Sequence, residues 1–197
     1  MAYLAGPDVF LPDARAHARR KVEICARHGL VGRAPLDEDA GSVRTTSAEA
    51  AWCGIYRQNL AMMEASDIII ANLTPFRGAS ADSGTLVELG WFVGRGRPVF
   101  GYSNVALPFA ARSRRQMEAI PDPLAGLSVE DFGLADNLMI VGALLERGHS
   151  LMVPLDGRDR EFNTLDVFER CVAMAAAILG TGANQPLHPG LMSGEMV

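Results

Sequence analysis

The run Asp67-Ile68-Ile69-Ile70-Ala71-Asn72-Leu73 decides the fold of this chain. An almost uninterrupted apolar run of this length is typical of a parallel strand that is covered on both faces of its sheet. A loop with Pro and Gly follows, and then comes Asp82-Ser83-Gly84-Thr85-Leu86-Val87-Glu88-Leu89-Gly90, which predicts a helix. Ligands of open α/β sheets bind at the carboxyl ends of the strands. Glu88 is therefore a candidate nucleophile or general acid-base.

The spacing between Asp82 and Glu88 predicts how the two carboxylates lie. If the helix begins at Asp82 or Ser83, Glu88 lies about 9 Å further along its axis. Helical side chains lean toward the N-terminus, so Glu88 points back over Gly84, which has no side chain to obstruct it. Asp82 can cap the helix and also face the ligand. Two simpler interpretations stay open, in which Asp82 is only an N-cap and Glu88 is a solvated helical glutamate.

Alternating strands and helices along the rest of the chain predict an α/β fold, with a doubly wound, mostly parallel five-stranded sheet and helices on both faces. The expected strands are 2–6, 30–33, 67–73, 98–102 and 151–154, and the expected helices are 12–27, 47–65, 83–95, 137–147 and 163–179. In the first helix, Val22, Cys25 and Ala26 are expected on the buried side and Lys21 outside. In the second, Ile55, Leu60, Met62 and Met63 are expected to face the sheet. Residues 103–130, with the basic group Arg112, Arg114 and Arg115, are expected to form an irregular surface loop, with a lid as the less favoured alternative.

The bulk composition limits the classes of protein to which this chain can belong. With 197 residues, 49% of them hydrophobic, it predicts a single domain over residues 1–180. The tail 181–197, rich in Gly and Pro, is expected to be flexible. A formal net charge of −5 argues against a nucleic-acid surface. Three separated cysteines and four scattered histidines indicate no metal site, and the absence of GxGxxG and GxxxxGK[ST] motifs indicates no nucleotide cofactor. No apolar run approaches a membrane span and no signal peptide is evident, so we expect a cytoplasmic protein.

Several segments in order resemble the nucleoside 2-deoxyribosyltransferase family. They are Tyr3-Leu4-Ala5-Gly6-Pro7-Asp8-Val9-Phe10, Tyr56-Arg57-Gln58-Asn59-Leu60, 66–78, 82–90 and Phe132-Gly133-Leu134-Ala135-Asp136-Asn137-Leu138-Met139. The resemblance covers most of residues 1–147. It implies a flavodoxin-like fold and a pentosyltransferase of nucleotide salvage. This enzyme would move 2-deoxyribose between nucleobases through a covalent deoxyribosyl-glutamate, with retention of configuration as in retaining glycosidases.

The resemblance also implies roles for individual residues. Glu88 matches the family's nucleophile, Tyr3 the tyrosine that holds this glutamate, and Asp82 the acid that binds the sugar hydroxyls. Asn137 matches an amide that is supplied to a neighbouring subunit's site, so a homo-oligomer is implied. The further substrate-binding residues implied by the resemblance are Gly6, Asp8, Phe10 and Asn59. The substrates would be a 2′-deoxynucleoside and a free nucleobase, with purines slightly favoured, and no cofactor or metal is implied.

One position departs from part of the family. Some members have an aspartate, a candidate proton donor to the leaving base, where this chain has Asn59. An amide cannot act as a general acid. The donor could therefore be Asp82, Asp8 or water, and Asn59 could instead hydrogen-bond a purine edge.

Two rival functions remain at this point. A related hydrolase cleaves 2′-deoxynucleoside 5′-monophosphates, but such enzymes have a phosphate-binding serine where this chain has Asp82. A carboxylate there would repel a phosphate dianion, although Ser80 and Ser83 lie close by. The other rival is a non-catalytic nucleoside-binding module, because a fold does not fix a function.

Overall fold

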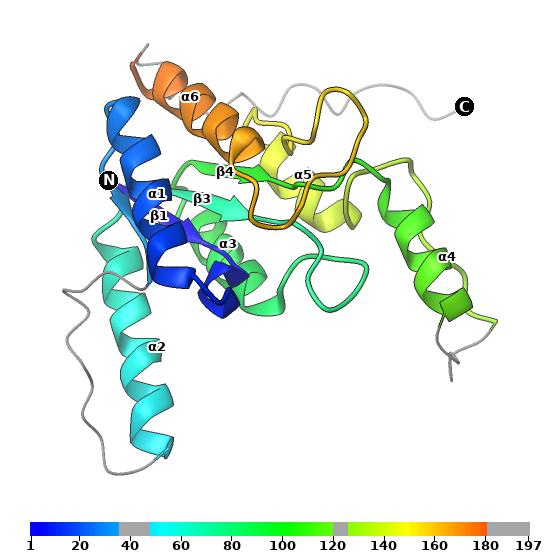
Figure 1. Ribbon diagram of the computed structural model, residues 1–197, viewed down its shortest axis with the longest axis horizontal. Coiled ribbons are helices and arrows are strands. Elements are labelled where there is room, and N and C mark those ends of the chain that lie inside the picture. Colours follow the sequence, from blue (N-terminus) through cyan, green and yellow to red (C-terminus); the bar gives the residue numbers. More distant parts are fainter. Residues whose placement is uncertain (36–47, 120–125, 181–197) are drawn as a thin grey trace.

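The computed structural model describes residues 1–35, 48–119 and 126–180. Its four strands are all parallel and form one sheet in the order β2-β1-β3-β4 (Figure 1). They are β1 (Ala2–Ala5), β2 (Gly32–Arg33), β3 (Ile68–Asn72) and β4 (Val99–Tyr102). The predicted doubly wound parallel sheet is thus confirmed. The strand order reverses between β1 and β3, and in doubly wound sheets this reversal is where a ligand crevice opens.

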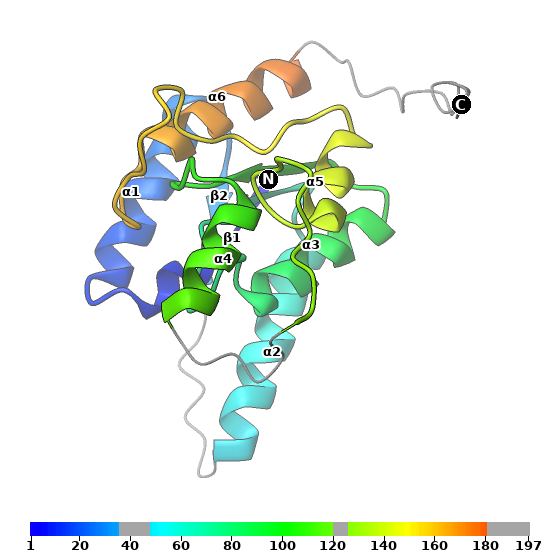
Figure 2. The same cartoon turned by 90° about the vertical axis from the view of Figure 1, so that its right-hand side faces the viewer.

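Helices cover both faces of the sheet, as the doubly wound topology requires. On one face lie α1 (Ala14–Arg27) and α6 (Asp166–Gly180), and on the other lie α3 (Ser83–Gly94) and α5 (Leu138–Leu145), with the C-terminal end of α2 (Ala48–Glu64) (Figures 1 and 2). A single turn of 3₁₀ helix, η1 (Pro7–Phe10), follows β1.

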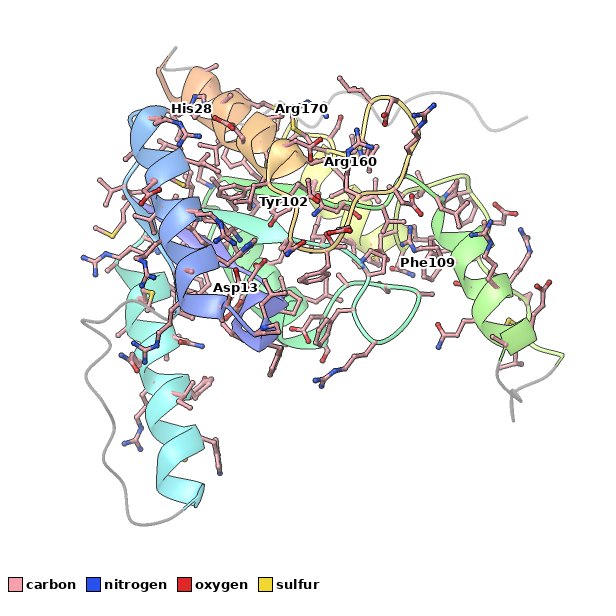
Figure 3. All side chains as sticks on the ribbon, viewed as in Figure 1. Asp13, His28, Tyr102, Phe109, Arg160 and Arg170 are labelled. Carbon is pink, nitrogen blue, oxygen red and sulfur yellow. The ribbon has the colours of Figure 1, made fainter. Side chains whose placement is uncertain are left out.

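The helix α4 (Phe109–Ala119) lies at the opposite end of the molecule from α1 (Figure 1). Figure 3 shows the same separation, with Phe109 at the start of α4 lying across the molecule from Asp13, the N-cap of α1.

The period-2 alternation of the strands divides the core into two clusters. Leu4, Ile70 and Phe100 face α1 and α6. Tyr3, Ile69 and Val99 face α3 and α5. Because Tyr3 pairs in register with Ile69, it lies in the middle of the sheet, directly beneath α3.

The predicted fifth strand is wrong. Residues 151–154 contribute only an isolated parallel bridge between Tyr102 and Met152. Two hydrogen bonds support this bridge, from Met152 N to Gly101 O at 3.0 Å and from Ser103 N to Met152 O at 2.8 Å. Pro154 has no N–H with which to extend the ladder, so the sheet ends at four strands.

The prediction of an irregular surface loop at 103–130 is also wrong, because α4 occupies residues 109–119. Pro108 directly precedes this helix and accepts a hydrogen bond from Arg112 N, as is common at helix starts. Arg112, expected on the surface, is only 8% exposed.

Three side chains on α1 and α2 lie on the opposite side from the predicted one. Lys21 was expected outside but is 2% exposed, because Asp8 pairs with it inside the protein. Ala26, expected to be buried, is exposed. Ile55, expected to face the sheet, is 56% exposed, because the N-terminal half of α2 extends away from the sheet (Figure 1). Met63, near the C-terminal end of α2, is buried as predicted.

The predicted flexible tail 181–197 falls outside the described residues. Within the described ranges, no helix is both long and apolar enough to cross a membrane. The same ranges contain no group of three His, Cys, Asp or Glu residues that could hold a metal ion.

Candidate active site

A hydrogen bond between Tyr3 and Glu88 lies at the centre of the candidate site. The Tyr3 hydroxyl donates to Glu88 Oε1 over 2.6 Å, and these residues are 85 positions apart in the sequence. Tyr3 is fully buried and its ring stacks on Phe92, with centroids 6.1 Å apart. A central strand therefore fixes the position of a carboxylate on α3.

The surroundings of Glu88 change the acidity of its carboxyl group. Burial raises the pKa of Glu88 from 4.5 to about 7, the hydrogen bond from Tyr3 opposes this rise, and the nearby charge of Asp82 adds to it. The pKa of Tyr3 is raised far above its ordinary value by burial and by the charge of Glu88. Tyr3 therefore stays a neutral donor, while Glu88 changes its charge near neutral pH.

Asp82 caps the helix that carries Glu88. Its Oδ2 accepts hydrogen bonds from Thr85 N at 2.9 Å and from Thr85 Oγ1 at 3.1 Å. A Cβ at Gly84 would lie only 3.1 Å from this same Oδ2, so a larger residue at Gly84 would crowd the cap. Because both contacts use Oδ2, the other carboxylate oxygen of Asp82 is left for a ligand, and capping does not exclude a binding role.

Asp8 lies inside a charged network below the turn that follows β1. Its Oδ2 accepts a hydrogen bond from Lys21 Nζ at 3.0 Å, and its Oδ1 lies 3.1 Å from His17 Nε2 and accepts from Asn72 Nδ2 at 3.0 Å. Burial alone would raise the pKa of Asp8, but Lys21 and His17 outweigh it and hold this pKa well below its ordinary value. Asp8 is thus an ionised anchor that joins β1, α1 and β3.

Gly6 allows the chain to turn tightly over this network. Its φ is +154°, and a Cβ would lie 2.5 Å from Asp8 Oδ2 and 2.7 Å from Asn72 Cβ. Only glycine fits such an approach without a shift of its neighbours. Gly6 and Asp8, which were predicted to bind substrate, thus shape the loop at the end of β1, and their role in substrate binding stays a prediction.

An aromatic cluster joins the loops that follow β1 and β3. Phe10, on η1, stacks on Phe76 with ring centroids 5.5 Å apart, and Phe76 contacts Phe162 at 6.2 Å. The guanidinium of Arg77 lies 5.1 Å from the Phe10 centroid and 4.7 Å from that of Phe76. Arg77 was not predicted as a site residue, since an exposed arginine in a loop is not distinctive in a single sequence.

Asn137 and Asn59 occupy different surroundings. Asn137 is the N-cap of α5, where its Oδ1 accepts from Met139 N and its Nδ2 donates to Glu130 Oε2. Glu130, also not predicted, accepts a further hydrogen bond from Leu138 N. Asn59 is half-buried on α2.

A second unpredicted cluster holds the loop that leads to Asp82. Arg112 donates to the carbonyl oxygens of Ala79 at 2.7 Å and Ala135 at 2.9 Å, and it pairs with Asp136 at 3.3 Å. Asp136 also accepts from the hydroxyl of Ser80 over 2.5 Å. These contacts join α4, the 74–81 loop and the start of α5 in one buried network.

Comparison with known proteins places this geometry in a family. A family model described as nucleoside 2-deoxyribosyltransferase matches residues 2–139. A 2-deoxyribosyltransferase from Leishmania mexicana is 31% identical, with a TM-score of 0.57, and the match covers 89% of this chain and 96% of that one. An uncharacterised protein of Schizosaccharomyces pombe is 29% identical over 91% of this chain and 90% of its own length. A 2-deoxyribosyltransferase from Bacillus psychrosaccharolyticus is 20% identical, with a TM-score of 0.47, over 82% of this chain and 87% of that one. The matched residues 2–139 include Tyr3, Asp82 and Glu88, and the chain therefore belongs to the nucleoside 2-deoxyribosyltransferase family.

Proposed function

We propose that this protein is a pentosyltransferase of nucleotide salvage that moves 2-deoxyribose from a 2′-deoxynucleoside to a free nucleobase. The ionised carboxylate of Glu88 attacks C1′, the C1′–N bond breaks, and its electron pair leaves with the base, which takes up a proton. A ring nitrogen of the second base then attacks C1′, loses a proton, and releases Glu88 as a carboxylate. Two inversions give net retention.

The hydrogen bond between Tyr3 and Glu88 is the observation that best supports this proposal. It fixes one carboxylate oxygen and leaves the other free for attack. Reaction geometry of this kind requires the nucleophile to be held within a narrow range of positions, which a buried tyrosine on a central strand provides. The half-buried setting keeps Glu88 poorly solvated, so its ionised form is a stronger nucleophile than an exposed glutamate.

The proton for the leaving base does not come from Asp8 in this proposal. Asp8 is ionised and bound to Lys21 and His17, and Asn59 is an amide. A water molecule bound by the Asp82 oxygen that does not cap α3 is the donor we favour, because Asp82 acts on Glu88 as a negative charge and so has no proton of its own to give. The same oxygen would accept hydrogen bonds from the sugar hydroxyls before the reaction.

The base would lie against Phe10, with Asn59 contributing a hydrogen bond to its edge. Phe10 is 60% exposed although its ring stacks on Phe76, so an apolar surface is available to a planar heterocycle. Gly6 lets the backbone approach the ligand closely.

A second copy of the chain would complete the site through Asn137. The capping contacts use Asn137 Oδ1 and one N–H of Nδ2, so one N–H remains for a neighbouring site. The surrounding side chains are apolar and exposed, with Phe132 at 68%, Leu138 at 40% and Met139 at 71%. Exposed apolar patches of this kind mark interaction surfaces, which supports a homo-oligomer.

Hydrolysis of 2′-deoxynucleoside 5′-monophosphates is the second function worth testing, because it would use the same Glu88. The position of Asp82 favours the unphosphorylated substrate, since its charge would repel a phosphate dianion. A nucleoside-binding module without turnover is the third alternative. The poor solvation of Glu88 argues against this module, because an ionisable group without a chemical role gains nothing from burial.

Incubation with deoxyinosine, with and without free adenine, followed by chromatography, tests the three functions together. Deoxyadenosine that forms only with adenine would establish transfer. Free hypoxanthine and deoxyribose without a new nucleoside would indicate a hydrolase, and deoxyinosine 5′-monophosphate would be tested next. The Glu88→Gln variant is the control and should show no product in either case. Product formation at the wild-type rate in this variant would refute the proposed role of Glu88.

A further inference from the structure

The loop that follows β3 presents a positive charge next to the aromatic surface at the site. Arg77 is exposed, and its guanidinium lies over the rings of Phe10 and Phe76. Phe10 comes from the end of β1 and Phe76 from the end of β3. These two strands are neighbours at the reversal of strand order, so Arg77 lies near the carboxyl ends of the strands, where ligands of doubly wound sheets bind.

Within the described ranges, the charge of Arg77 has no ion-pair partner. In the part of the chain that the structure describes, no carboxylate pairs with Arg77, whereas Arg20, Arg95 and Arg114 each pair with one. The backbone of Arg77 has a φ of +55°, and no other non-glycine residue in the described ranges has a positive φ. Such a conformation is disfavoured for an arginine and persists where the surroundings impose it, often at ligand sites.

A guanidinium that rests on ring faces keeps its N–H groups directed outward in its own plane. This edge is complementary to two neighbouring acceptors of a flat ligand. The O6 and N7 atoms of a 6-oxopurine form such a pair, and Arg binds them in a bidentate manner. Adenine has an amino donor in place of O6 and would oppose the same arginine.

We propose that Arg77 determines base specificity, by binding the O6 and N7 edge of a 6-oxopurine that stacks on Phe10. The inference rests on the proposed function, because it assumes that the base of the substrate lies against Phe10. It makes hypoxanthine, guanine and their deoxynucleosides the preferred substrates, with adenine still accepted but bound at least about tenfold more weakly.

Binding of free bases, measured by isothermal titration calorimetry, tests the role of Arg77 in base specificity without any turnover. The wild-type protein should bind hypoxanthine at least about tenfold more tightly than adenine, the discrimination expected of one bidentate pair. Arg77→Gln should bring the two affinities to within about threefold. Arg77→Lys, which keeps the charge but not the planar fork, should lose most of the preference as well. Arg115→Gln, at an exposed arginine on α4, is the matched control and should keep it.

One more variant and a phosphorylated ligand show whether backbone strain or phosphate binding accounts for the effect of Arg77. Arg77→Asn removes the guanidinium with a residue that tolerates positive φ, so the test does not depend on a strained backbone, and it should behave as Arg77→Gln does. Equal affinities of the wild type for hypoxanthine and adenine, or a preference that survives in these variants, would overturn the inference. Weaker binding of deoxyinosine 5′-monophosphate, but not of hypoxanthine, by Arg77→Gln would also overturn the inference, because Arg77 would then bind phosphate.

The outcomes for Arg77 and for the reaction itself can be told apart. Base preference without transfer of deoxyribose would contradict only the proposed function. Transfer with an unchanged preference in Arg77→Gln would contradict only the role of Arg77.

Discussion

Replacement of Glu88 by glutamine should stabilise the protein at alkaline pH and have a much smaller effect in acid. The pKa of Glu88 is raised from 4.5 to about 7 in the folded protein, so the folded state binds this proton more tightly than the unfolded chain does. Stability contributed by the protonated group is complete below about pH 4.5 and is lost as the pH rises toward 7. At pH 8 the poorly solvated, ionised carboxylate lowers the free energy of unfolding, and a neutral amide at the same position does not.

The size of the effect follows from the shift in pKa. Each unit corresponds to about 1.36 kcal/mol, so a shift from 4.5 to about 7 amounts to about 3 kcal/mol at pH 8. Residual contact with water lowers this, and we expect a gain between about 2 and 3 kcal/mol. The amide oxygen of glutamine still accepts a hydrogen bond from Tyr3, so the substitution removes charge with little change of packing.

Urea denaturation at fixed protein concentration, followed by circular dichroism at pH 5, 6, 7 and 8, measures the difference directly. The advantage of Glu88→Gln should grow by about 2 kcal/mol across this range and level off near pH 8. Glu118→Gln, at an exposed glutamate on α4, should show no such trend. A constant difference from pH 5 to pH 8, or a loss of stability at pH 8, would refute the assignment of Glu88 as a strained, poorly solvated carboxylate.

Four further substitutions test other parts of the site. Tyr3→Phe removes a hydrogen bond that lowers the pKa of Glu88, so the acidic limb of the pH profile of kcat/KM should move to higher pH, and an unmoved limb would contradict the role of the hydroxyl. Asp8→Asn leaves the buried Lys21 without its counter-charge and should lower the free energy of unfolding at pH 7 by about 3–5 kcal/mol; because the pKa of Asp8 is depressed, the loss relative to wild type should shrink as the pH falls below about 4. Gly6→Ala should lower the unfolding midpoint in urea by the equivalent of about 1–3 kcal/mol, and a neutral result would mean that the turn relaxes freely. Arg112→Lys cannot reproduce the planar set of hydrogen bonds and should cost about 2 kcal/mol or more, as measured by thermal unfolding.

The fold could be predicted from the sequence because the signals that specify it are local. The isoleucine run at β3 indicates a strand that is covered on both faces, and the Pro and Gly residues mark where the elements end. The helix α4 was missed because it is short and rich in Arg, with Phe109 and Met117 as its only large apolar residues. The signal present was Pro108 directly before it, which is common at helix starts.

The errors within the candidate site have a different origin. Lys21 and Arg112 were expected in solvent because charged residues usually are. Each is buried by a partner that is distant in the sequence, Asp8 in one case and Asp136 in the other. No periodicity in a single sequence reveals such pairs. Tyr3 and Glu88 were linked only through the family resemblance, since 85 residues separate them.

The attachment of Glu88 to Tyr3 has a consequence for how this enzyme family could diversify. Tyr3 belongs to a central strand. Phe10, Arg77 and the 74–81 segment belong to the loops that follow the carboxyl ends of β1 and β3. In the proposed reaction, the carboxylate is therefore held by a residue of a strand, whereas the segments that would meet the base are loops. Exchange of those loops between relatives should alter which base is accepted while the chemistry at C1′ continues, so the scaffold separates the evolution of selectivity from that of reactivity.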